Sequence, residues 1–132
     1  MWAYVSGTWI LIDRVHERAS FTRTVTLVQQ TAARWPQTSR IYVEQAANGA
    51  ALIDTLKRKA LITPVIPRGS KEARALAVQP LVDQGLVKVV DACYDDAFFT
   101  ELREFPFAKH DDQVDALTQA LSQSKQDYYK IG

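Results

Sequence analysis

The chain has 132 residues, of which 47% are hydrophobic and 23% are charged, with five glycines and five prolines. This composition fits one globular domain with its own core, and it excludes the collagen-like, low-complexity and disordered classes. Sixteen Lys and Arg residues against fifteen Asp and Glu residues give a formal net charge of +1, which neither requires nor excludes a nucleic-acid partner.

The apolar runs are too short for a transmembrane helix, and the first residues lack the basic flank and apolar stretch of a signal peptide. We therefore expect a cytoplasmic protein with no membrane partner. Cys93 is the one cysteine, so no internal disulfide can form, and two histidines are too few for a zinc site built on Cys and His. Any metal ion would have to be held by carboxylates.

The hydrophobic pattern predicts alternating strands and helices. A hairpin is expected first, with strands at 1–5 and 8–15 around a Ser6-Gly7 turn, followed by an amphipathic helix from Ser20 to Trp35. In chain order we then expect a strand at 40–45, a helix capped by Asn48, a strand at 62–67, a helix at 71–84 capped by Gly69-Ser70, a strand at 86–90, a helix capped by Asp95, a last helix from Asp111 to Ser124, and a polar tail at 125–132. Pro80 should kink or split the helix at 71–84.

Strands separated by helices indicate parallel pairing, whereas the first two strands suit antiparallel pairing. We therefore predict one α/β domain over residues 1–132, in three layers. Its mixed sheet would start with the antiparallel hairpin and continue with parallel strands.

Glu44 is the first candidate functional residue, because it ends a strand that otherwise has the pattern of a sheet interior. Ligands of open α/β sheets bind at the carboxyl ends of the strands. The alternative is structural: Glu44 pairs with a nearby Arg or Lys, or ends the strand in solvent.

Three aspartates at the start of the last helix are the second candidate, within KHDDQVDA at 109–116. Asp111 and Asp115 are four residues apart and so share one helix face. Capping and the helix dipole explain one or two acidic residues here without any function. A divalent ion is the other explanation, since close carboxylates repel one another, and Mg²⁺ or Mn²⁺ prefers oxygen ligands.

Three blocks of sequence resemble the C-terminal nuclease domain of tailed-phage terminase large subunits. They are VEQAANGAAL at 43–52, IPRGSKEARALAVQPLVDQGLVKVV at 66–90 and FPFAKHDDQVDALTQAL at 105–121. The resemblance implies an RNase H-like fold and cleavage of concatemeric double-stranded DNA during phage or prophage genome packaging in the bacterial host cell. It also implies double-stranded DNA as a partner, together with other terminase or portal components. The chain has no GxxxxGK[ST] phosphate-binding loop, so it is not the packaging motor.

The resemblance assigns catalytic and metal-binding roles to two regions. Glu44 and Asp111 or Asp112 match two of the family's three ligand positions, around two divalent ions that activate the attacking water and stabilise the leaving 3′ oxygen. Asp115 would be a further ligand or would orient a water on the metal. His110 is a general acid or base in one interpretation, and a local hydrogen-bonding residue in the one that we favour.

The sequence departs from the family at the first strand, whose aspartate supplies the third ligand position. This chain begins at what resembles the second strand. Asp13 is a poor substitute, because the expected topology puts it roughly 10 Å from Glu44 at about 4.8 Å per strand. We therefore predict a rearranged sheet or a homo-oligomer. A non-catalytic remnant of the nuclease domain is the alternative function. Another RNase H-like nuclease, such as a junction resolvase, is a third possibility that would lack these sequence blocks.

Cations near the acidic cluster are candidate DNA contacts. Arg68, Lys71 and Arg74 surround the Gly69-Ser70 loop, and Lys109 precedes the aspartates. Such a loop at a helix start can hold a phosphate without reading sequence. The alternative is a solvated helix face with no ligand.

Overall fold

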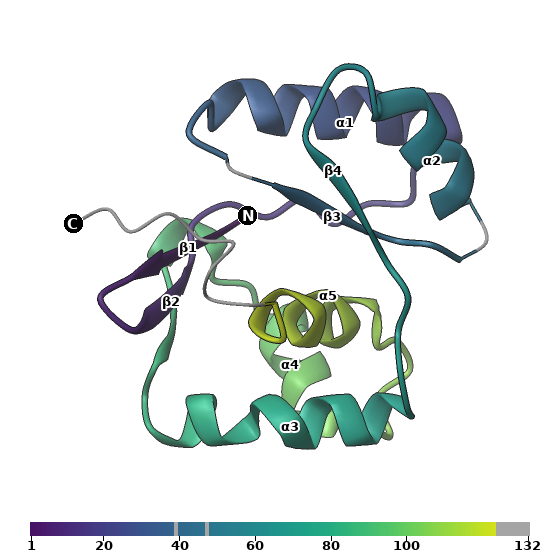
Figure 1. The fold of residues 1–132 in the computed structure, drawn as a ribbon. Coiled ribbons are helices and arrows are strands. Elements are labelled where there is room, and N and C mark those ends of the chain that lie inside the picture. Colours follow the sequence, from purple (N-terminus) through teal and green to yellow (C-terminus); the bar gives the residue numbers. More distant parts are fainter. Residues whose placement is uncertain (39, 47, 124–132) are drawn as a thin grey trace. The chain divides into compact units, whose positions relative to one another are not determined.

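The computed structural model describes residues 1–38, 40–46 and 48–123. The chain divides into two compact units, one formed by residues 1–14 with the chain from residue 68 onward, and the other by residues 15–67. In chain order the elements are β1 (Trp2–Val5), β2 (Thr8–Leu11), α1 (Phe21–Arg34), β3 (Ile41–Glu44), α2 (Gly49–Leu56), β4 (Ile62–Val65), α3 (Lys71–Asp83), β5 (Val87–Val89), a 3-10 turn (Asp91–Cys93), α4 (Asp96–Glu104) and α5 (Asp112–Leu121) (Figure 1).

The first unit contains a three-stranded mixed sheet in the order β1-β2-β5. The hairpin turns at Ser6 and Gly7, which both have positive φ angles (49° and 86°), as the tight turns that match strand twist require. Strand β1 pairs antiparallel with β2, and β2 pairs parallel with β5, with Trp9 opposite Val87. The predicted sequence of an antiparallel hairpin followed by a parallel strand is confirmed in this unit.

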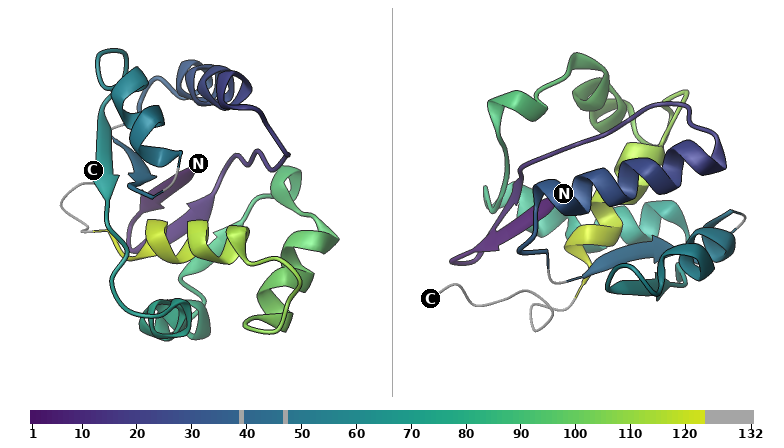
Figure 2. Two further views of the ribbon diagram at one scale, coloured as in Figure 1. Left: turned by 90° about the vertical axis from the view of Figure 1, so that its right-hand side faces the viewer. Right: turned by 90° about the horizontal axis from the view of Figure 1, so that it is seen from above.

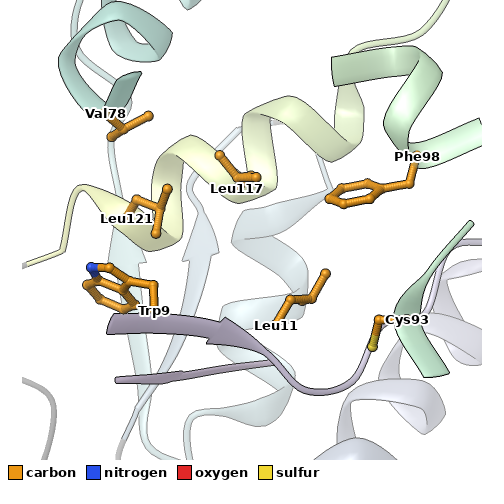
Figure 3. Packing of buried hydrophobic residues seen from close by; sticks show 7 residues of the cluster. All are labelled: Trp9, Leu11, Val78, Cys93, Phe98, Leu117 and Leu121. Carbon is orange, nitrogen blue, oxygen red and sulfur yellow. The ribbon is translucent and has the colours of Figure 1, made fainter. Parts of the chain in front are cut away.

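The core of the first unit lies between β2 and three helices. Helix α5 runs between β2 and α3, as the views in Figures 2 and 3 show. The buried side chains come from β2, α3, the 3-10 turn, α4 and α5: Trp9, Leu11, Val78, Cys93, Phe98, Leu117 and Leu121. Burying a large apolar side chain stabilises a fold by about 1.5–3 kcal/mol. This packing therefore holds α5, and the acidic residues at its start, on a rigid base.

The second unit contains a two-stranded parallel sheet of β3 and β4, with Glu44 opposite Val65 at the carboxyl end. Helix α2 packs on both strands and α1 packs on α2. Leu56 of α2 is the one fully buried side chain among the described residues of this unit. The strands thus form one sheet of three and one of two, where one mixed sheet was expected. The three-layer arrangement and the single domain over 1–132 stay predictions.

Two predicted helix caps are confirmed. The Ser70 hydroxyl accepts a hydrogen bond from the backbone N–H of Ala73 at 3.1 Å, and the Asp95 carboxylate accepts one from Phe98 at 3.0 Å. The prediction for Asn48 is wrong in detail: this residue occupies the N-cap position of α2, but its side chain makes no capping hydrogen bond. Its backbone is already helical (φ −72°, ψ −9°), whereas a capping side chain needs an extended backbone to reach the next turn.

Pro80 does not split α3, which continues from Lys71 to Asp83. A proline costs one helical hydrogen bond to the carbonyl four residues earlier, here that of Leu76. Leu76 is itself exposed. The last helix ends at Leu121, earlier than the predicted Ser124, which with the tail at 125–132 lies outside the described residues.

Candidate functional site

Helix α5 begins in the acidic stretch, but another helix caps it. Asp111 occupies the N-cap position, and its side chain accepts no capping hydrogen bond. Glu101 of α4 supplies the acceptor: its Oε1 atom lies 2.7 Å from the backbone nitrogen of Gln113 and 3.0 Å from that of Val114. These are the N–H groups that an N-cap residue normally satisfies. The Asp111 carboxylate is therefore left to bind other groups.

A buried polar network supports this arrangement. Glu101 is 6% exposed, and its second oxygen accepts a hydrogen bond from the side-chain amide of Gln113 at 2.9 Å. Arg14 donates a hydrogen bond to the amide oxygen of Gln113 and pairs with Asp95 at 3.2 Å. Its guanidinium also lies over the Phe98 ring, 5.4 Å from the centroid. The network ties the start of α5 to α4 and to the segment after β2.

Asp111 and Asp115 converge on the side chain of Lys71, the first residue of α3. The Nζ atom lies 2.8 Å from both Asp111 oxygens and 2.8 Å from Oδ2 of Asp115. The hydrogen bonds that the Lys71 ammonium donates, first to Asp111 and then to Asp115, raise the pKa of Lys71 above its ordinary value, so the ammonium stays charged. The prediction that the two aspartates share a helix face is confirmed.

Arg74 is the second cation of this group, which we call the carboxylate–cation cluster: Lys71, Arg74, Asp111 and Asp115. The guanidinium lies 3.1 Å from Oδ1 of Asp115 and donates a second hydrogen bond to the carbonyl of Gly69 at 2.9 Å. Asp115 and Arg74 are 20% and 21% exposed, whereas Lys71 is 44% exposed. Two negative and two positive charges make the cluster neutral.

The remaining predicted site residues of the first unit lie on its surface. Asp112, the first residue of α5, is exposed, and so are Lys109 and His110 immediately before the helix. Arg68 is exposed at the start of the Gly69-Ser70 loop. The role of Asp112 as a metal ligand stays a prediction. So do the DNA contacts of Arg68 and Lys109 and the local hydrogen bonding of His110.

Glu44 is the last residue of β3, as predicted, and is partly buried in the second unit. Gln45 continues the pairing with β4 by donating to the carbonyl of Val65 at 2.8 Å, and Gly49 then closes a tight turn by donating to the carbonyl of Ala46 at 2.8 Å. A Cβ atom on Gly49 would lie 1.8 Å from the backbone oxygen of Glu44, which is impossible without movement. Glycine at position 49 therefore lets α2 begin directly against the strand end that carries Glu44.

The structure thus places the predicted ligands in two units, with Glu44 in one and Asp111, Asp112 and Asp115 in the other. Within the first unit Asp111 and Asp115 approach one cationic group, and no third His, Cys, Asp or Glu of the described residues completes a metal-binding group with them. That Glu44 and the α5 aspartates share a metal ion stays a prediction.

Sequence reasoning missed Glu101 and Arg14. A signal for Glu101 was present, because it lies at helical spacing between Phe98 and Phe105, on the apolar side of α4. A carboxylate at an inward position needs a buried donor. Nothing in the sequence identifies α5 as that donor, since Gln113 is 12 residues away.

The family model of the terminase RNase H-like domain matches residues 2–124. The chain belongs to this family. The terminase RNase H-like domain has a nuclease-type role, and RNase H-like nuclease domains generally use divalent metal ions. Terminase domains in general bind DNA and work with other terminase and portal components.

Searches of curated proteins and of solved structures gave no significant match. Over the described residues, each helix of this terminase domain is too short or too polar to cross a bilayer.

Proposed function

We propose that this terminase RNase H-like domain is a metal-dependent endonuclease that cuts concatemeric double-stranded DNA during phage or prophage genome packaging. One observation carries the proposal: Glu101 caps α5, and the carboxylates of Asp111 and Asp115 converge on a cation. Side-chain capping, one of the structural explanations for an acidic helix start, does not account for Asp111, which makes no capping hydrogen bond.

The residues fit a divalent metal ion by the chemistry of their donors. The Lys71 ammonium, held by oxygens of both aspartates, is a stand-in for a cation at this place. Carboxylate oxygens are the ligands that Mg²⁺ and Mn²⁺ prefer. Asp111, Asp112 and Asp115 would hold the ions from α5, and Glu44 would hold them from the end of β3.

Bound divalent ions would activate the attacking water and neutralise charge at the leaving 3′ oxygen. The protein's own groups position the carboxylates and the DNA. Arg74 orients Asp115 through one nitrogen and is anchored on Gly69 through the other. The exposed cations Arg68 and Lys109 would contact DNA phosphates without recognising the base sequence. Lys71 and Arg74 would add further phosphate contacts. His110 would keep a local hydrogen-bonding role.

A non-catalytic remnant of the nuclease domain is the second candidate function, and the same cluster favours it. Lys71 and Arg74 already neutralise Asp111 and Asp115, so the folded protein does not need a metal ion to hold these carboxylates together.

Nicking of supercoiled plasmid DNA in Mn²⁺ or Mg²⁺ tests the proposal. The unaltered protein should nick the plasmid, and Glu44→Ala and Asp111→Ala should each abolish nicking while the circular dichroism spectrum stays unchanged. Glu104→Ala is the matched control, because this exposed carboxylate at the end of α4 lies outside the site. Metal-dependent nicking that survives Glu44→Ala would remove Glu44 from the site. A protein that never nicks DNA would favour the remnant.

A further inference from the structure

The four oxygens of Asp111 and Asp115 all contact cations of the protein itself. The Lys71 ammonium contacts both oxygens of Asp111 and one oxygen of Asp115. The Arg74 guanidinium contacts the other oxygen of Asp115. We propose that Lys71 is an internal competitor of the divalent ion, which holds the two carboxylates in the metal-free protein and leaves when the ion binds. The inference rests on the proposed function, because it assumes that these carboxylates are metal ligands.

Repulsion between the aspartates explains why a substitute cation is needed. Two carboxylates on successive turns of one helix face repel each other, and they do so more strongly when they are partly buried. An ammonium between them relieves this repulsion, so the start of α5 is stable before any metal ion arrives. A metal ion that binds the side of these oxygens facing Lys71 would replace a cation that is already there.

Lys71, and not Arg74, is the cation that can leave. It is 44% exposed and is held only by its ammonium, at the end of a flexible four-carbon chain. Arg74 is 21% exposed, and its second nitrogen is fixed by the Gly69 carbonyl. Moreover, Lys71 is the first residue of α3, a position where the helix dipole disfavours a positive charge. The ammonium of Lys71 is therefore stabilised by the carboxylates of α5 and not by the dipole of its own helix.

Calorimetric titration of the whole protein with Mn²⁺ tests the competition. Lys71→Met removes the charge and keeps most of the side-chain bulk, so it should bind Mn²⁺ about 5-fold more tightly or better, given about 1 kcal/mol for a partly exposed ion pair. Lys57→Met is the matched control. Lys57 is also paired with an aspartate, Asp54, so this variant loses the same charge from another Lys–Asp pair. It should bind Mn²⁺ as the unaltered protein does.

A second measurement uses the melting temperature. In EDTA, Lys71→Met should melt below the unaltered protein, because its aspartates face each other without the lysine. Added Mn²⁺ should then raise its melting temperature by more than it raises that of the unaltered protein. Lys71→Gln should behave in the same way, and it carries the test if Lys71→Met does not fold.

The outcomes separate this inference from the proposed function. If both Lys71 variants bind Mn²⁺ no more tightly than the unaltered protein does, the competition is overturned. Loss of Mn²⁺ binding in Asp111→Asn would still support the metal site. Full Mn²⁺ affinity in Asp111→Asn overturns the metal site on α5. Absence of Mn²⁺ binding in both the unaltered protein and the Lys71 variants overturns both proposals.

Discussion

Glu101 binds Gln113 twice: one carboxylate oxygen accepts from the backbone N–H at 2.7 Å, and the other accepts from the side-chain amide at 2.9 Å. The contact joins α4 to the first turn of α5 in the interior of the first unit. It also takes over the capping of α5 from Asp111, whose carboxylate then lies with Lys71.

Substitution of Glu101 should destabilise the protein strongly. Glu101→Ala leaves two backbone N–H groups and an amide without their acceptor, and we expect a loss of about 3 kcal/mol in the free energy of unfolding. Glu101→Gln keeps one carbonyl acceptor and should cost about half as much. Urea unfolding measures both values. Glu104→Gln, on the exposed side of the same helix, should change the free energy by less than about 0.5 kcal/mol. Equal effects at the two positions would contradict the capping role.

Gly49→Ala should destabilise the second unit. The added Cβ would lie 1.8 Å from the Glu44 carbonyl oxygen, so the turn after β3 must open, at a cost of about 2 kcal/mol or more. Ala50→Gly, at the next position of α2, should cost about 1 kcal/mol or less, from helix propensity alone. Urea unfolding with limited proteolysis of the region 15–67 compares the two. A Gly49→Ala protein as stable as the unaltered chain would show that the close approach is absent.

Asp95 should make the protein sensitive to acid. The hydrogen bond from the backbone N–H of Phe98, with a smaller contribution from Arg14, holds the pKa of Asp95 below its ordinary value. A carboxyl with a lowered pKa stabilises the fold at neutral pH, and this contribution is lost as the pH falls through the acidic range below about 4. Asp95→Asn removes the titrating group, so the free energy of unfolding should fall less steeply with acid. Asp83→Asn, at the exposed end of α3, is the control. If the free energy of unfolding falls with acid equally steeply for Asp95→Asn and the unaltered protein, the prediction is refuted.

Arg68 and Lys109 should contribute to DNA affinity through phosphates. Each of Arg68→Ala and Lys109→Ala should weaken binding of unrelated duplexes equally, and each should reduce the slope of log affinity against log salt by about 1. Fluorescence anisotropy at several salt concentrations measures the slope. Lys88→Ala, an exposed lysine of β5, should leave it unchanged. If neither Arg68→Ala nor Lys109→Ala changes the slope of log affinity against log salt, these residues belong to a solvated surface that does not contact DNA.

Much of the local structure could be predicted from the sequence, because local patterns determine it. The alternation around Ser6-Gly7 indicated the hairpin, and Ser70 and Asp95 marked the helix starts that they cap. The four-residue spacing of Asp111 and Asp115 was enough to place them on one face of α5.

The contacts that decide the chemistry are long-range, and a single sequence does not encode them in any local pattern. Lys71 was expected to face DNA, yet its partner carboxylate lies 40 residues further along the chain. Arg14 reaches Gln113 over 99 residues. Pro80 was expected to kink or split α3, but the helix continues through it from Lys71 to Asp83.

Anomalous X-ray scattering from a crystal of the Mn²⁺-loaded protein measures most directly whether mid-chain and C-terminal carboxylates share an ion. We predict a manganese peak within coordination distance of a Glu44 oxygen and of an oxygen of Asp111 or Asp112, with Lys71 turned away from the carboxylates. Manganese bound by residues of one unit alone, or carboxylates that keep Lys71 at saturating Mn²⁺, would contradict the account.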